Sequence, residues 1–289
     1  MANILRMDLY RLVHGKSLWI MLGVIVCMAV VSAAFMAYVS SPAYLDSLQA
    51  AGASGTGGIH IGITAGNGPD AGDYQDAAEA AALMTAGTSA EALVGTLFLN
   101  GGGLAVLFVI FIAIFLAAEF ESGFSKNVFT VQPSRLAFLG ARIVEILVLA
   151  ALFTVMIVAA PLATAAVTGL ELASSPLPDF ALWGVLVAVV AAGFGMLTAL
   201  AVWATRKMAA GIGIGILLAS GLVTLGIQGL GMLIPSLSLL ADYTLSSCMG
   251  SLSLGLGGPL GAEHIALVGT AFIAVAGALC ALVLKRKDV

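Results

Sequence analysis

The eleven lysine and arginine residues of this chain fall into four short windows, and long apolar runs separate those windows. The windows hold Arg6, Arg11 and Lys16; Lys126, Arg135 and Arg142; Arg206 and Lys207; and Lys285, Arg286 and Lys287. Hydrophobic residues make up 61% of the chain and charged residues only 9%, whereas soluble domains carry about 25% charged residues. Membrane proteins retain Lys and Arg in short cytoplasmic loops. The pattern therefore predicts a multi-pass membrane protein whose basic windows lie in the cytoplasm.

Six apolar runs are long enough to cross the hydrocarbon layer of a membrane, which needs about 20 residues per helix. The predicted spans are residues 18–39, 98–118, 143–168, 180–204, 209–234 and 265–284. An even number of spans places both termini on one side, and the basic windows place that side in the cytoplasm. We therefore expect an all-α polytopic membrane protein with a single transmembrane domain over residues 1–289 and a location in the cell membrane.

The segment before the first span, residues 1–17, predicts a short amphipathic helix in the inner membrane interface. On a helical period Leu5, Leu9, Leu12 and Val13 share one face, while Arg11 lies elsewhere. An ordinary charged flank that only sets orientation is the alternative. The apolar run that follows is about 22 residues long, which exceeds the about 7–15 of a signal-peptide core. We therefore expect a retained first span.

The predicted outer connections hold ten of the fifteen acidic residues and no basic residue. Residues 40–92 form the longest one, rich in Gly and Asp. This composition buries little apolar surface and predicts a flexible loop with solvated acids rather than a calcium site. Residues 244–262 are apolar but broken by Gly, Ser and Pro259, and they predict a re-entrant or interfacial hairpin.

Motifs of catalysis and cofactor binding are absent from the sequence, which has no GxxxxGK[ST], HExxH or GxSxG pattern. The three cysteines and three histidines show no metal-ligand spacing. Basic residues are too dispersed for a nucleic-acid surface. We therefore expect no enzyme activity, no bound cofactor and no nucleic-acid partner. Arg142 and Glu145 share a helix face and are expected to pair near the inner interface.

The most informative stretch is the predicted cytoplasmic loop at residues 119–135, after the second span. It combines acids, a base, Gly and Phe in a compact element, which suits docking on another protein. A plain interhelical loop is the alternative reading, because Gly123 and Pro133 are residues that commonly occur in turns and loops.

This stretch resembles the signature region of type-2 ABC transporter permeases. The matching positions are Glu119, Phe120, Gly123, Lys126, Val128, Phe129, Pro133, Ser134 and Arg135, with Arg142 where the family carries a base. Phe124 replaces the family's usual Thr, and Ser134 follows Pro133 directly. The start of the chain, with Arg11, Leu12 and Trp19, is similar to the family's N-terminal interface helix.

The resemblance implies the membrane subunit of an ABC exporter. Two such subunits, identical or sister chains, face each other across the translocation path, and each docks one of two ATPase subunits, which bind ATP and Mg. The implied coupling residues are Glu119, Phe120, Glu121, Gly123, Phe124, Lys126, Phe129, Pro133 and Arg135, and the interface helix contributes Leu5, Leu9, Arg11 and Leu12, in contact with membrane lipid. An ion-coupled secondary transporter or another polytopic membrane protein is the alternative, and a membrane-embedded enzyme is a third reading.

Overall fold

The computed structural model describes residue 7 and residues 10–39, 89–121, 135–168, 173 and 175–286. These residues are almost entirely helical. Four helices are long and apolar enough to cross a membrane, or five if a bent pair counts as one span. The coarse prediction of an all-α chain with apolar spans is therefore confirmed, whereas the number six and the side on which the termini lie stay predictions.

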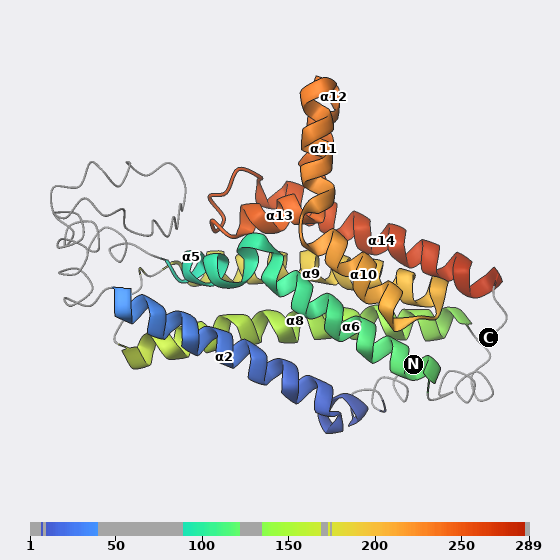
Figure 1. The fold of residues 1–289 in the computed structure, drawn as a ribbon, viewed down its shortest axis with the longest axis horizontal. Coiled ribbons are helices and arrows are strands. Elements are labelled where there is room, and N and C mark those ends of the chain that lie inside the picture. Colours follow the sequence, from blue (N-terminus) through green and yellow to red (C-terminus); the bar gives the residue numbers. More distant parts are fainter. Residues whose placement is uncertain are drawn as a thin grey trace, which may run out of the picture.

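The structure describes the following helical elements in chain order. They are α2 (Lys16–Val39), α5 (Ala90–Val94), η1 (Gly95–Leu99), η2 (Asn100–Gly102), α6 (Gly103–Glu121), α8 (Arg135–Thr168), α9 (Leu177–Thr205), α10 (Met208–Ala219), α11 (Leu222–Leu233), α12 (Pro235–Ala241), α13 (Leu245–Leu252) and α14 (Ala262–Arg286). The long helices form a bundle in which α9 contacts α6, α8, α10 and α14 (Figure 1). Trp183 and Phe194 of α9 are buried in its core.

Several helix ends gather at one end of the bundle, toward the right in Figure 1. They include the start of α2, the end of α6, the start of α8, the connection between α9 and α10, and the end of α14. Arg206 caps α9 at this end, and Lys285 lies in the last turn of α14. We call it the basic end. Successive helices that alternate in direction, with basic residues in every second connection, bring all those basic residues to one end of the bundle.

Two helices begin earlier than the predicted spans. The second apolar element begins at Ala90, so the last residues of the predicted loop 40–92 are helical. Helix α8 begins at Arg135 and so reaches back to the predicted loop 119–135. The first run forms α2 (Lys16–Val39), which covers the predicted span 18–39. Helices continue beyond their apolar cores because backbone hydrogen bonds propagate at little cost.

The predicted fifth span is broken. Helices α10 and α11 meet at a 48° bend, and Gly221 between them has a φ of +76°. Only glycine adopts this conformation readily. Helices α11 and α12 project from the bundle as a hairpin (Figure 1). Beyond it, α13 packs on α9, where Nε1 of Trp183 donates to the Leu252 carbonyl at 2.8 Å.

Candidate functional site

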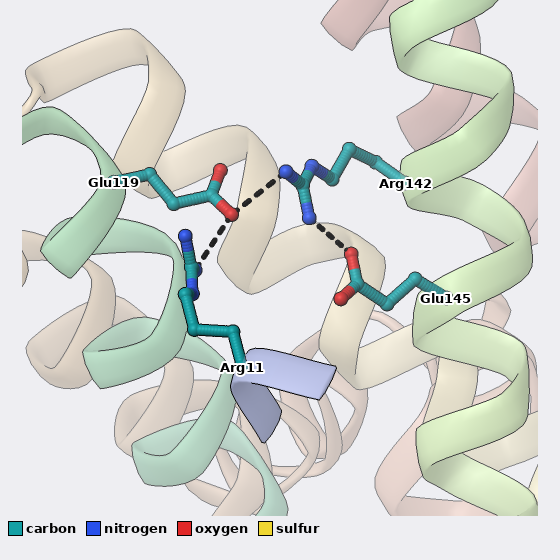
Figure 2. Close-up of polar contacts among 4 residues, drawn as sticks. All are labelled: Arg11, Glu119, Arg142 and Glu145. Atoms are coloured by element: carbon teal, nitrogen blue, oxygen red, sulfur yellow. Dashed lines mark hydrogen bonds and ion pairs between the residues drawn. The ribbon is translucent and has the colours of Figure 1, made fainter. Parts of the chain in front are cut away.

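Four charged side chains meet at the basic end, and we call Arg11, Glu119, Arg142 and Glu145 the charge cluster (Figure 2). Nη2 of Arg11 donates to Oε1 of Glu119 at 2.9 Å. Nη2 of Arg142 lies 2.8 Å from the same carboxylate oxygen, and Nη1 of Arg142 donates to Oε2 of Glu145. Two arginines therefore share one glutamate, and one of them continues to the second glutamate.

The cluster is largely removed from solvent. The side chain of Arg142 is 0% exposed and that of Glu119 is 2% exposed, whereas that of Arg11 is 34% exposed. The four charges sum to zero. An isolated buried charge is strongly unfavourable, and pairing with an opposite charge offsets this desolvation. Each member therefore depends on the others, and Arg142 depends on them most.

An aromatic ring one helical turn away from a cluster residue positions the guanidinium of each arginine. Glu119 lies one turn after Phe115 on α6, and the guanidinium of Arg11 stacks over the Phe115 ring at 4.7 Å from its centroid. Arg142 lies one turn after Phe138 on α8, with its guanidinium 5.0 Å from that ring. Arginine favours such aromatic faces because its planar cation is weakly hydrated. The rings thus set where both guanidinium groups can sit.

The cluster joins three parts of the chain. Arg11 belongs to a short helical segment that ends at Gly15, before α2 begins. Glu119 lies in the last turns of α6, and Arg142 lies early in α8. These last two helices flank residues 122–134. The Glu119–Arg142 ion pair therefore holds together the two helices from which that stretch departs.

The structure brings two of the predicted site residues together, Arg11 and Glu119. Leu12 is buried in the hydrophobic core, while Val13, expected on the same face, is 44% exposed. The predicted pairing of Arg142 with Glu145 is confirmed. Their link to Glu119 was not predicted, because pairs between helices leave no spacing signal in the sequence.

The other predicted site residues carry no described side-chain contacts. Phe120 and Glu121 close α6 and Arg135 opens α8, with side chains outside the described set. The residues that lie outside the described ranges altogether are Leu5, Leu9, Gly123, Phe124, Lys126, Phe129 and Pro133. Their coupling and interface roles stay predictions.

The described part of the chain holds no group of three or more His, Cys, Asp or Glu residues placed to bind a metal ion. Comparison with models of protein families and with curated proteins finds no match. We therefore infer the function from this chain's own residues.

Proposed function

We propose that this chain is the membrane-spanning permease subunit of an ATP-driven ABC exporter in the cell membrane, working as a pair with a second copy or a sister chain. The observation that carries the proposal is the charge cluster, which ties together the two helices flanking residues 122–134. That stretch contains most of the residues that resemble the family's coupling region.

A partner protein that pushes on a loop moves the membrane helices only if the two helix ends that flank the loop move together as one rigid body. The ion pair between Oε1 of Glu119 and Nη2 of Arg142, at 2.8 Å in a desolvated site, joins these two helix ends. Charge pairs in such sites are screened less than pairs in water and so resist separation more. The arrangement supports a docking element that passes motion to α6 and α8.

The energy source must be a separate chain, because this sequence lacks a phosphate-binding loop. On this proposal two ATPase subunits hold ATP and Mg, and one docks on each permease. A two-fold arrangement follows, since each permease offers one copy of the docking element. The permease itself binds no cofactor and contacts lipid through its apolar helices.

The test is purification of the tagged chain in mild detergent from its own membranes. A co-purifying protein with a phosphate-binding loop, and ATP hydrolysis by the complex, are the expected results. Phe124→Ala and Phe129→Ala should reduce ATPase recovery while leaving permease yield unchanged, since buried aromatic anchors dominate interfaces. Lys126→Ala is the matched control, with a smaller effect, because rim charges mainly alter association rate.

Two outcomes would contradict the proposal. One is an active preparation without any ATPase. The other is solute movement in vesicles driven by an ion gradient alone, which would favour the secondary-transporter alternative.

A further inference from the structure

Two helix breaks lie against each other inside the bundle. In the second apolar element, η1 and η2 interrupt the α-helix, and Gly101 and Gly102 have φ of +72° and +76°. In the fifth, α10 ends at Ala219 and α11 begins after Gly221. A Cβ on Gly102 would collide with the carbonyl oxygen of Ala219. The two breaks therefore touch, and glycine at Gly102 makes the contact possible.

Both breaks lie within the depth of the hydrocarbon layer. Helix α6 runs from the break to Glu119 at the basic end, about 25 Å at the helical rise of about 1.5 Å per residue. Helix α10 runs from Lys207 to the second break, about 18 Å on the same basis. A bilayer's hydrocarbon layer is about 30 Å thick. With the basic end at one membrane surface, the breaks fall in the far half of that layer.

The contact is bordered by exposed polar groups. Asn100 and Gly101 of the first break and Ser220 of the second are exposed. Among the described residues, the side-chain amide of Asn100 has no hydrogen-bond partner, while its backbone N–H donates to the Gly95 carbonyl. Ser220 Oγ donates to the Leu217 carbonyl at 3.1 Å. Neighbouring hydroxyls add to this polar character, since Ser246 Oγ donates to the Leu218 carbonyl at 2.7 Å.

Covering such a polar surface with lipid would cost much free energy, because its polar groups would lose their hydrogen bonds to water. Irregular backbone and free amides at membrane depth occur where protein buries them or where they line a water-filled cavity. Discontinuous helices near the middle of transporters often form the solute site for this reason. The surface around Asn100 is exposed in the folded chain, so its own helices do not bury it.

We infer that the paired breaks line a water-filled path within the membrane, and that Asn100 and Ser220 present a neutral hydrogen-bonding site to the transported molecule there. The groups at the site are an amide, hydroxyls and backbone, which suit uncharged polar parts of a solute, such as hydroxyl or amide groups. The role in transport rests on the proposed function, whereas the water-filled path rests only on the apolar spans and the two breaks.

Cysteine accessibility tests this inference. Cys27 is exposed and is first replaced by Ser, while Cys248 and Cys280 are buried and can stay. Asn100→Cys and Ser220→Cys are treated in membranes with a hydrophilic, membrane-impermeant thiol reagent. The controls are Val155→Cys on α8 and Val275→Cys on α14, at apolar positions that are 63% and 60% exposed.

The two break positions should react at least about tenfold faster than the controls, because lipid suppresses the thiolate that reacts. Ser220→Cys tests the inference independently if Asn100→Cys fails to fold. Rates equal to those of the controls would overturn it.

The labelling needs no ATPase, so the two proposals fail separately. Slow labelling in a chain that still recovers its ATPase rejects the water-filled path alone. Fast labelling in a chain without an ATPase keeps the path and rejects the ATP-driven function.

Discussion

Arg142 of α8 places Nη2 2.8 Å from Oε1 of Glu119 on α6, and Arg11 reaches the same oxygen at 2.9 Å. One carboxylate thus pairs with two cations from different parts of the chain. The arrangement is balanced only because Glu145 pairs with the far side of Arg142. Loss of any single charge leaves the cluster with a net charge in a site that water scarcely reaches.

Glu119→Gln should lower the stability of the folded protein by about 3–5 kcal/mol, the usual cost of removing one partner from a buried pair. Thermal unfolding in detergent measures the loss. Glu263→Gln, the same change on an exposed glutamate of α14, is the matched control and should be close to neutral. An equal effect of the two substitutions would contradict the importance of the cluster.

Combining Arg11→Gln with Glu119→Gln should cost less than the sum of the two single changes. The double variant restores a neutral cluster, because Arg142 and Glu145 remain as a pair. Coupling of about 0.5–3 kcal/mol is typical of residues in direct contact. A double-mutant cycle from thermal unfolding gives this quantity. Additive losses would show that Arg11, which is 34% exposed at its side chain, does not interact energetically with Glu119.

Gly215→Ala should destabilise the chain, because a Cβ there would collide with Val109 of α6 and approach Thr198 of α9. Overpacking of this kind costs about 1–3 kcal/mol. Gly213→Ala on the same helix is the control, since nothing lies within 4 Å of its Cβ position. That change should be neutral or stabilising by about 0.5–1 kcal/mol, because alanine favours a helix. The reverse order of melting temperatures would refute the close contact of α10 with α6.

Orientation can be tested at two exposed positions on opposite sides. Lys207 lies at the basic end, between α9 and α10, and Gly257 lies in the turn after α13. An impermeant thiol reagent added to intact cells should label Gly257→Cys and should reach Lys207→Cys only after permeabilisation. The reason is that short loops rich in Lys and Arg stay in the cytoplasm. Labelling of Lys207→Cys in intact cells would contradict the predicted topology and indicate the opposite orientation.

Cys248 of α13 should resist thiol reagents up to high pH. Burial raises the pKa of this thiol from 9.0 to about 12, against a smaller lowering by a backbone hydrogen bond and with a minor increase from the charge of Asp242. Between these values the unfolded thiol ionises while the folded one keeps its proton. The folded state then binds more protons, so its stability falls as pH rises through this window and is unaffected below it.

Labelling at pH 10, followed by mass spectrometry, should therefore modify Cys248 in detergent-unfolded protein and not in the folded protein. Similar rates in the two states would show that the thiol is accessible.

The sequence alone determined the features that depend on neighbours along the chain. Apolar runs must be helical in lipid because backbone groups have no other partner there, and the runs predicted for α9 and α14 correspond closely to the helices observed. The Arg142–Glu145 pair was also predictable, because residues three apart on a helix share a face. These are local consequences of composition and helical period.

Only the tertiary structure decided which helices meet. Arg11 and Glu119 are 108 positions apart in the sequence, and no periodicity says that the N-terminal segment reaches the end of α6. The break at Gly221 was equally hidden, since a glycine-rich run can form a straight helix or a bent one. Helix packing and charge pairing between distant segments are selected by shape and desolvation in three dimensions, and neither leaves a local pattern to read.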